Sequence, residues 1–513
     1  MKLERTKNTA RNIFFGSISK IYNLIIPFIM RTVMMYILGM EYLGLNSLFF
    51  SVLSVLSLAE LGVGSALVFS MYKPVAENDT KRVCALMQLY KIYYRVIGVV
   101  ILIVGLAITP YIPKLISGDV PSDMNVYILY LMNLSISVLS YWLFSYKICL
   151  LDVHQRIDVV NKVDVVLNTV KYALQIFVLV VFKNYYYYLI VSLVTRVVAN
   201  IVIALVVNKM YPQYKARGKL EKTEVRKINK RVADLFASKL GNIVLDSSDT
   251  IVISAFLGLT ALSIYQNYCF VMNAVYGFVA LITTSSLAGI GNSIFTESKE
   301  KNLKDLNKFT FVIAWISAFC VSCFASLYQP FMELWVGKEN MLPYGMVILF
   351  CIYFYVRQIS SVLITYKDAA GIWKQDKYRV LVTALANLAL NLLMVNYIGY
   401  YGILLSTVLS MSIIGLPWLL KNLFSVLFKT SSKKYMKKLA VYTVVTVVSC
   451  ALNIFVTNFS FDSIILTIVA RLLLSFIVPN TIFFLLFRKT DEFKSFVGLL
   501  NQFTGKRFKF LNK

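Results

Sequence analysis

Long apolar runs alternate with short polar segments along almost the entire chain. Fourteen of these runs hold about 17–25 mostly apolar residues each, which is enough for a helix to cross a hydrocarbon core ~30 Å thick. The predicted spans are Ile13–Leu38, Leu45–Met71, Ile92–Ile108, Met124–Tyr146, Val163–Phe182, Tyr185–Val207, Leu235–Leu257, Leu262–Ala288, Phe309–Tyr328, Tyr344–Tyr366, Val380–Tyr397, Gly402–Leu420, Leu439–Phe455 and Ile464–Phe487. This pattern predicts an all-α polytopic membrane protein with fourteen transmembrane helices.

The composition agrees with a membrane protein and argues against several other classes. Of the 513 residues, 58% are hydrophobic and only 15% are charged, whereas a soluble domain carries about 25% charged residues. No small-residue cleavage site follows the first apolar run, so we expect a retained span rather than a signal peptide. The single histidine, His154, lies in a predicted cytoplasmic loop. Cys320 and Cys323 lie inside the ninth span, where they are expected to be small apolar residues. The sequence therefore predicts no His-based catalytic site, no cofactor and no metal site.

The distribution of basic residues predicts the orientation in the membrane. The net charge is +27, and 41 of the 52 Lys and Arg lie at the termini or in connections that follow even-numbered spans. Only three lie in connections after odd-numbered spans, and eight lie inside spans. Because cytoplasmic loops are the Lys/Arg-rich ones, both termini are expected in the cytoplasm. The positive charge is thus explained by topology and by anionic head groups, and not by nucleic acid.

A weak internal repeat divides the chain. "SKIYN" at 19–23 matches "SKLGN" at 238–242, and "ILGMEYLGL" at 37–45 matches "FLGLTALSI" at 256–264, both 219 residues apart. "YKICLLDVHQ" at 146–155 matches "YKDAAGIWKQ" at 366–375 with an offset of 220. These matches predict a repeat of six spans, and because six is even the two copies share one orientation, as in some secondary transporters. Two six-helix lobes around a central cavity follow, with two more helices at the C-terminus.

The predicted organisation has six parts. They are an N-lobe over 1–208, a basic cytoplasmic connector over 209–234, a C-lobe over 235–420, a basic loop over 421–438, the last two spans over 439–487 and a basic tail over 488–513. Nine Lys and Arg lie between Lys209 and Arg231. They fit either an amphipathic connector or an ordinary solvated loop on the cytoplasmic side.

Charged residues inside the spans are the candidate functional groups, because each costs about 2.5–3.5 kcal/mol near the bilayer centre. The basic ones are Lys20, Arg31, Arg95, Lys171, Arg196, Lys239, Arg357 and Arg471, and the acidic ones are Glu60, Asp164, Asp246 and Asp249. Arg95 and Asp164 lie in the first turns of their spans, where snorkelling explains them. Eight basic against four acidic residues leaves four positive charges without an acid, which predicts an anionic ligand such as a phosphate or diphosphate head group.

Three spans carry polar residues along one helical face. The stripes are Gly16, Lys20, Asn23, Pro27 and Arg31 in span one, Asn168, Lys171 and Gln175 in span five, and Lys239, Asn242, Asp246 and Asp249 in span seven. Under the repeat, Lys20 and Lys239 are equivalent positions. Either they face the central cavity from opposite lobes, or each pairs with an acid such as Asp246 or Glu60.

Glu60 lies in the middle of span two, in "LAELGVG". It has three interpretations: a proton or ion-coupling site, a partner for Arg31, or a structural acid. The glycines at 62 and 64 allow a close helix contact or a local break.

Residues 38–91, most specifically 58–79, resemble the first lobe of bacterial polysaccharide and O-antigen flippases of the multidrug/oligosaccharidyl-lipid/polysaccharide (MOP) exporter superfamily. Residues 247–268 and 368–410 are similar to second-lobe segments of the same family. The resemblance implies fourteen helices in two six-helix bundles plus a final pair, in the bacterial cytoplasmic membrane. It also implies a transporter and not an enzyme, which flips an undecaprenyl-diphosphate-linked oligosaccharide to the outer leaflet for O-antigen, capsule or exopolysaccharide synthesis.

The resemblance also suggests binding residues and partners. The family's basic cavity residues correspond to Lys20, Arg31 and Lys239, and on charge and depth alone to Arg196, Arg357 and Arg471. Lys171, Asn23 and Asn242 complete the predicted substrate-binding set, and Glu60, Asp246 and Asp249 are candidates for ion coupling or helix pairing. Expected partners are the lipid-linked glycan, membrane lipids and polysaccharide assembly proteins.

Two other functions stay open. A multidrug or small-molecule antiporter of the same superfamily would be expected to have an acid-rich cavity for cations. A membrane polysaccharide polymerase would need a sizeable outer loop, and the predicted outer loops are short.

Overall fold

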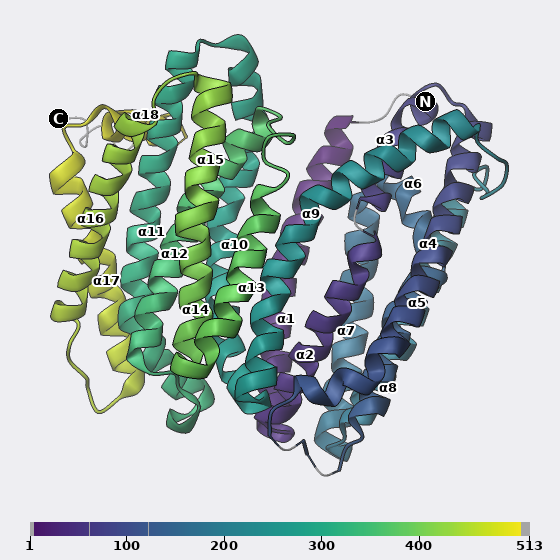
Figure 1. Cartoon of the computed structure of the whole chain (residues 1–513), viewed down its shortest axis with the longest axis horizontal. Helices are drawn as coiled ribbons and strands as arrows, with labels where there is room; N and C mark the ends of the chain where they lie inside the picture. The colour runs from purple at the N-terminus through teal and green to yellow at the C-terminus, as the bar shows by residue number, and fades with distance from the viewer. Residues whose placement is uncertain (1–4, 61, 119, 122, 504–513) are drawn as a thin grey trace. The chain divides into compact units, whose positions relative to one another are not determined.

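The structure is a computed structural model that describes residues 5–60, 62–118, 120–121 and 123–503. Within its helices, the side chains of residues 5–14, 17–18, 59, 234, 237–239, 242, 246, 499–500 and 502–503 lie outside this description. Every regular element in the described part of the chain is a helix (Figure 1). The chain divides into two compact units, unit 1 over Met1–Ser263 and unit 2 over Ile264–Lys513.

Unit 1 contains α1 (Arg5–Ile37), α2 (Met40–Leu56), the 3-10 turn η1 (Ser57–Glu60), α3 (Val63–Ala76), α4 (Thr80–Ile108), η2 (Thr109–Leu115), α5 (Val126–Trp142), η3 (Ser145–Lys147), α6 (Ile148–Val153), α7 (Ile157–Phe182), α8 (Tyr185–Met210) and α9 (Lys222–Leu257). The helix α10 (Leu259–Thr296) begins in unit 1 and continues into unit 2. Unit 2 also contains α11 (Lys299–Val336), η4 (Lys338–Asn340), α12 (Tyr344–Ala369), α13 (Arg379–Ile398), α14 (Tyr400–Leu409), the π-helix η5 (Ser410–Gly415), α15 (Leu416–Asn422), the π-helix η6 (Leu423–Phe428), α16 (Lys433–Val456), α17 (Ile464–Phe487) and α18 (Asp491–Phe503).

The predicted fold class is confirmed, since the chain is an all-helical, multi-pass membrane protein. Among the described residues, eleven helices are long and apolar enough to cross a membrane. The number rises to twelve when the pair Val126–Trp142 and Ser145–Val153, bent by 43°, counts as one span. Each of the fourteen predicted ranges contains helix, but a count of fourteen spans is not confirmed.

The second predicted span is interrupted near its middle. After α2, the chain passes through the 3-10 turn η1 and starts a new helix, α3, at Val63. Gly62 has a φ of +89°, and a Cβ there would lie 2.6 Å from Leu235 Cβ and 2.9 Å from the Val232 carbonyl oxygen of α9. The left-handed backbone and the close approach of α9 both require glycine at this position. The local break expected at these glycines is therefore present.

The helices of unit 1 are neighbours in a closed ring. Going round it, α1 packs on α7, α7 on α8, α8 on α5, α5 on α4, α4 on α3, α3 on α9, α9 on α2 and α2 on α1, while α2 also packs across the ring on α5. Because α9 packs along α2 and α3, this compact unit extends past the predicted start of the C-lobe at residue 235. The six-helix lobes themselves stay a prediction.

Most of the basic residues of unit 1 lie at one end of its helices, around α6 and His154. We call this end the basic end. His154, directly after α6, is buried there against the rings of Tyr211 and Tyr214, with ring centroids 4.3 and 5.7 Å away. Its Nδ1 lies 2.7 Å from the Leu150 carbonyl oxygen. The Asp158 carboxylate, fully buried, pairs with Arg156 at 2.9 Å and with Lys162 at 3.3 Å. These contacts fix the segment that joins α6 to α7.

At the opposite end of unit 1, α2 meets the junction of α9 and α10. A Cβ on Gly44 would lie 2.2 Å from the Leu259 carbonyl oxygen. The hydroxyl of Thr260 donates to Glu41 at 3.2 Å, and the hydroxyl of Ser263 donates to the Met40 carbonyl oxygen. Because Gly44 has no side chain, the backbones of α2 and α10 lie in contact. The hydrogen bonds of Thr260 and Ser263 to α2 form beside this contact.

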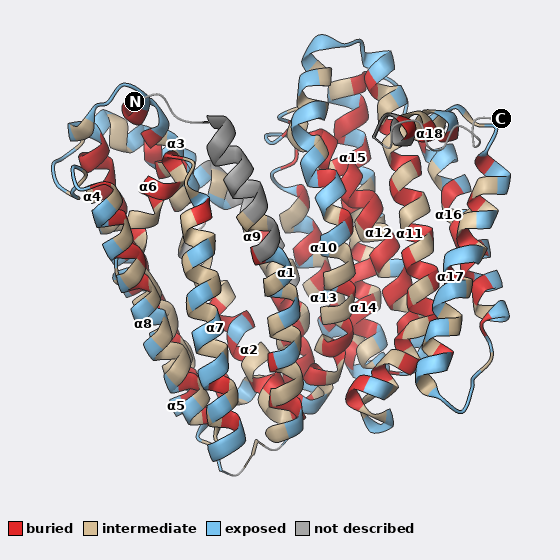
Figure 2. Cartoon of the chain, turned by 180° about the vertical axis from the view of Figure 1, so that it is seen from behind, coloured by how far each residue is buried: buried red, intermediate tan, exposed pale blue. Residues whose placement is uncertain are grey.

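Unit 2 is organised around α11. This helix packs against α12, α16, α17 and α18, and Figure 2 shows buried residues concentrated along α11 and α12. Fully buried aromatic rings from three helices meet there, for example Tyr268 of α10, Tyr328 of α11 and Phe350 of α12. The outer helices α16 and α17 instead expose many large apolar side chains, as expected for surfaces that face lipid.

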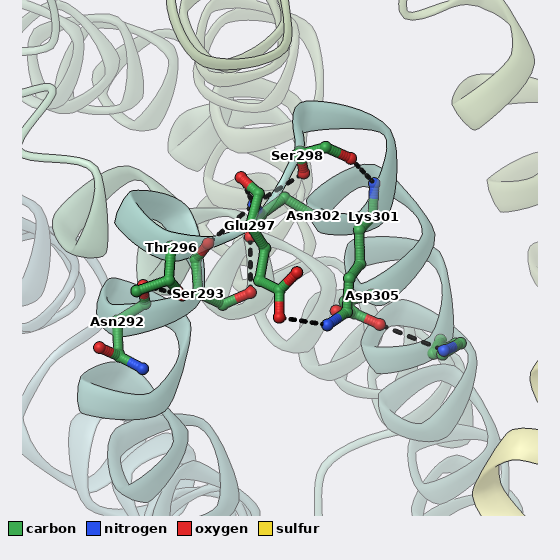
Figure 3. A network of polar contacts seen from close by, with 9 residues as sticks. Asn292, Ser293, Thr296, Glu297, Ser298, Lys301, Asn302 and Asp305 are labelled. Atoms are coloured by element: carbon green, nitrogen blue, oxygen red, sulfur yellow. Dashed lines mark hydrogen bonds and ion pairs between the residues drawn. The ribbon is translucent and has the colours of Figure 1, made fainter.

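A short polar turn joins α10 to α11 (Figure 3). The buried Asn302 amide donates to the carbonyl oxygens of Ser293 and Ser298, both at 3.0 Å, and Ser293 donates to the Asn302 side-chain oxygen at 3.0 Å. The Ser298 hydroxyl accepts from the Lys301 amide at 3.2 Å as the N-cap of α11. The Asn302 side chain therefore links the last turn of α10 to the first turn of α11.

We expect Gly44→Ala to destabilise the protein by about 1–3 kcal/mol, because the added methyl group has no room against the Leu259 backbone. Thermal unfolding of the purified protein in detergent measures this change. Gly277→Ala in α10 is the matched control, since a Cβ there meets nothing within 4 Å, and it should leave stability unchanged or slightly raised. Equal unfolding temperatures for both variants would contradict the close contact.

Burial lowers the pKa of His154 below its ordinary value of 6.5. The unfolded chain then binds this proton more readily than the folded chain, so the stability present above pH 6.5 is lost as the pH falls below it. His154 is the only histidine in the sequence. We therefore expect His154→Gln to flatten the decline in unfolding temperature between about pH 7.5 and 5.5. An unchanged pH profile in this variant would refute the buried neutral imidazole.

Candidate functional site

A polar cavity of about 440 Å³ lies inside unit 1, among four of its helices. Its lining residues are Asn46, Phe50, Leu53 and Ser54 of α2, Ser57 of η1, Asn133, Ile136, Ser137 and Ser140 of α5, Asp164, Leu167, Asn168 and Lys171 of α7, and Ser192, Thr195, Arg196 and Ala199 of α8. On each helix these positions recur three or four residues apart, so each helix turns one face inward. The cavity is therefore built from the polar faces of otherwise apolar helices.

Three charged side chains line this cavity: Asp164, Lys171 and Arg196. Lys171 is half-buried, and its ammonium lies 4.0 Å from the centroid of the Tyr172 ring. Within the described part of the chain, none of the three forms an ion pair within 4.0 Å or a hydrogen bond to another residue. The cavity thus holds two basic side chains and one carboxyl group that are not joined by a direct ion pair. Asp164 lies in this cavity, so the snorkelling that explained it from sequence does not describe its surroundings.

Next to the cavity, the Glu60 carboxylate of η1 accepts two hydrogen bonds from tyrosines. Tyr94 donates to Oε1 and Tyr141 donates to Oε2, both at 2.7 Å. The hydroxyl of Tyr90 lies 3.0 Å from that of Tyr94, and since Tyr94 gives its proton to Glu60, Tyr90 donates in turn. Two hydroxyl donors suit an ionised carboxylate, which can only accept. Ser57 of the same turn lines the cavity, so Glu60 is linked to it through η1.

The polar stripe of α1 is divided by the structure. The side chain of Lys20 is exposed and has no partner within the described residues, and Asn23 donates to Ser19 at 3.2 Å. Arg31 is half-buried and donates to the Ser263 carbonyl oxygen at 3.5 Å. The acid considered for Arg31, Glu60, takes its hydrogen bonds from tyrosines instead. Lys20 and Arg31 therefore sit in different surroundings although they share a helix face.

The stripe of span seven lies on α9, a single helix. The side chains of Lys239, Asn242 and Asp246 lie outside the described residues, so their predicted roles stay predictions. Asp249 is described and half-buried, and it has a polar partner.

The two predicted arginines of unit 2 are occupied by contacts inside that unit. Arg357 donates to Asn273 at 2.6 Å and stacks over the Tyr276 ring at 3.9 Å. Arg471 donates to the Phe459 carbonyl oxygen at 3.0 Å and to the Ser326 carbonyl oxygen at 3.1 Å. Arg471 thereby ties α17 to the preceding loop and to α11, which is a structural task.

Several polar residues of these sites were not among the predicted ones. The cavity residues without a prior prediction are Asn46, Ser54, Ser57, Asn133, Ser137, Ser140, Ser192 and Thr195. In unit 2, a buried network joins α13 and α14: Asn387 donates to Thr407 at 2.8 Å, and Asn391 donates to Asn387 at 3.4 Å. Their recurrence at helical spacing is the signal that could have found them.

Comparisons with known proteins agree with this architecture. The family described as "Polysaccharide biosynthesis protein" matches residues 9–288. No curated protein sequence matches the chain. Among solved structures, the lipid II flippase MurJ in an inward closed conformation is 17% identical with a TM-score of 0.70, covering 93% of this chain and 99% of that one.

Two further solved structures share the fold. An inward-facing multidrug resistance MATE family transporter of the MOP superfamily is 13% identical with a TM-score of 0.60, covering 80% of this chain and 96% of that one. A MOP superfamily transporter from Pyrococcus furiosus, described as having a binding pocket of reverse polarity, is 12% identical with a TM-score of 0.54, covering 83% and 96%. At these identities the likeness shows the fold.

We expect Tyr141→Phe to lower the free energy of unfolding by about 1–2 kcal/mol, because the half-buried carboxylate of Glu60 loses one of its two tyrosine donors. In a Glu60→Leu background the same change should cost less than about 0.5 kcal/mol, since the acceptor is gone. Chemical unfolding of the four proteins of this cycle measures the coupling. Additive effects would contradict the hydrogen bond between Tyr141 and Glu60.

Proposed function

Because the chain belongs to the polysaccharide biosynthesis protein family and has the fold of MOP-superfamily transporters, we propose that it flips an undecaprenyl-diphosphate-linked oligosaccharide. The movement runs from the cytoplasmic to the outer leaflet of a bacterial cytoplasmic membrane, with both termini in the cytoplasm. Its product would supply the synthesis of O-antigen, capsule or exopolysaccharide.

The cavity of unit 1 is the observation that supports this proposal most directly. Lys171 and Arg196 project charge into a polar space within the membrane region, with Asp164 as the single described acid that lines it. Guanidinium and ammonium groups form their strongest hydrogen bonds with phosphate oxygens. The asparagine, serine and threonine side chains around them suit sugar hydroxyls, which both donate and accept. A lipid diphosphate that carries a glycan offers both kinds of group.

The other predicted contacts fall into two sets. Lys20 and Asn23 of α1, with Lys239 and Asn242 of α9, keep their proposed substrate-binding roles, and Lys20 is free to take one. Arg31, Arg357 and Arg471 already donate to groups of their own unit. To bind substrate, these three arginines would have to give up an existing hydrogen bond. We therefore rank them below Lys171 and Arg196 as substrate-binding residues.

Transport needs no covalent chemistry in this scheme. The two predicted lobes would rock to open the site alternately to each side, as in other transporters built from repeats. A membrane potential of about 100 mV, negative inside, favours outward movement of each negative charge by about 2.3 kcal/mol. Proton or ion coupling through Glu60, Asp246 or Asp249 can add to this driving force without being required by it.

A multidrug antiporter is the second candidate, since MATE family transporters share the fold. A pocket for cationic drugs should be dominated by acids. The charge balance of the unit 1 cavity is the opposite, so the lipid-linked anion is preferred. The two candidates also differ in which residue matters most, Lys171 and Arg196 for an anion and Asp164 for a cation.

We expect Lys171→Ala and Arg196→Ala each to reduce flipping by about tenfold or more, because each removes a charge-assisted contact of about 1.5–3 kcal/mol. The measurement is transport of a defined undecaprenyl-diphosphate oligosaccharide in proteoliposomes with matched protein content. Lys81→Ala is the matched control, since Lys81 is exposed on α4 and has no contact with the cavity.

Full transport by both cavity variants would reject this binding site. Loss of cationic drug transport in Asp164→Asn, with no flipping by the unaltered protein, would instead favour the antiporter.

A further inference from the structure

The first three turns of α9, residues 222–233, lie on the surface of unit 1 at its basic end. In Figure 1 this part of α9 crosses over α3 and α4 before the helix turns along the unit. The contacts agree with the picture, because Glu224 pairs with Arg82 of α4 at 2.8 Å and Arg231 donates to Ser70 of α3 at 3.2 Å. The basic connector expected from sequence is therefore partly a docked helix.

The inner face of this helix is held by specific contacts. Ile228 is 2% exposed, and the Arg231 guanidinium lies 4.3 Å from the centroid of the Phe69 ring. Tyr93 of α4 donates to the Asn229 side-chain oxygen. Glu224, Ile228 and Arg231 are four and three residues apart, so they lie on one face of the helix. Side-chain contacts thus fix the rotation of the helix about its axis.

The outer face carries four basic side chains in a row. Lys222, Arg226, Lys227 and Lys230 are all exposed, and within the described part of the chain none has a hydrogen bond or an ion pair. At 3.6 residues per turn they fall within an arc of about 140°, away from the buried face. The row is thus presented to the surroundings by the fixed rotation of the helix.

This arrangement is unfavourable for the helix itself. Lys222 with Arg226, and Arg226 with Lys230, are like charges four residues apart, which repel. A cation in the first turn also opposes the helix dipole. A bound anion would offset this repulsion.

We infer that the row of Lys222, Arg226, Lys227 and Lys230 binds the phosphate head groups of anionic membrane phospholipids in the leaflet at the basic end. A cluster of Lys and Arg just outside a membrane-spanning helix on the cytoplasmic side is attracted by anionic lipid head groups. The partner is thus a lipid surface, matched by charge, and not a soluble anion.

The inference has a structural consequence for α9. The helix runs unbroken from Lys222 to Leu257, and the predicted cavity residues Lys239 and Asn242 lie on its later turns. Head groups bound to the first turns of α9 would therefore fix the position of the helix that also carries Lys239 and Asn242.

The experiment titrates purified full-length protein in neutral detergent with short-chain phosphatidylglycerol or phosphatidylcholine and records the unfolding temperature. We expect phosphatidylglycerol to raise it more than phosphatidylcholine does, and salt to weaken the difference. The test variant carries Lys222→Gln, Arg226→Gln, Lys227→Gln and Lys230→Gln, which keep good helix formers. Its apparent preference for phosphatidylglycerol should fall by about fivefold per cation removed.

A second variant with the same net charge is the matched control. It carries Lys429→Gln, Lys433→Gln, Lys434→Gln and Lys437→Gln, all exposed residues just before α16 or in its first two turns, and it should keep most of the response. Each response is measured against the variant's own unfolding temperature without lipid, so a lower starting stability does not hide the result. An undiminished response in the α9 variant, or equal losses in both, overturns the inference. So does equal stabilisation by inorganic phosphate alone, which would indicate a phosphate site and not a lipid surface.

Discussion

Hydrocarbon does not solvate charge, and this constraint decides where each ionisable side chain of the chain can lie. A charge inside a span must find a partner, a backbone carbonyl or a polar cavity. Arg471 meets the requirement with carbonyl oxygens of a loop and of α11, and Glu60 meets it with two tyrosine hydroxyls. These contacts also connect helices, so the cost of each buried charge is offset by a link between elements. In these two cases, the contacts that satisfy a charge also hold neighbouring elements together.

Among the residues that the structure describes, two cations of unit 1 have no such partner, and they are the residues proposed to bind the substrate. Lys171 and Arg196 face a cavity with one carboxylate near them and no ion pair among the described residues. Positive charge left uncompensated in this way is unfavourable without a ligand, and it is tolerated because the cavity is polar and open to water. Arg357 and Arg471, in comparison, already donate hydrogen bonds to groups of unit 2. Their hydrogen bonds stabilise that unit, whereas Lys171 and Arg196 are the cations proposed to bind an anion. In the sequence, charge and depth alone rank Arg196 equally with Arg357 and Arg471, whereas Lys171 also belongs to a polar stripe.

The fold class followed from hydropathy because every backbone group in lipid must be satisfied within a helix. Mean hydropathy did not reveal the bend after α5, and it left open whether the glycines at 62 and 64 break the helix, since a 3-10 turn and a left-handed glycine do not change it. Two residues of the predicted stripe on α7, Asn168 and Lys171, line the cavity, and the substrate-binding role of Lys171 stays a prediction. Asn46, Asn133 and the serines recur at helical spacing, but they were missed because small polar residues are common in apolar helices and this signal is weak in one sequence. The contact of Arg31 with Ser263 joins residues 232 positions apart, which no local pattern can reveal.

The helix α9 shows how one constraint acts at two depths. Its first turns lie at the surface of unit 1, where Lys222 and Lys230 are exposed. Its later turns lie in the predicted seventh span, where Asp249 needs a partner and has one. Gly62 lets α9 approach the start of α3, and Gly44 lets Leu259, which follows α9, approach α2. These close contacts hold both ends of the part of α9 that carries the predicted stripe. One continuous helix therefore joins the proposed head-group site to the predicted polar stripe of span seven.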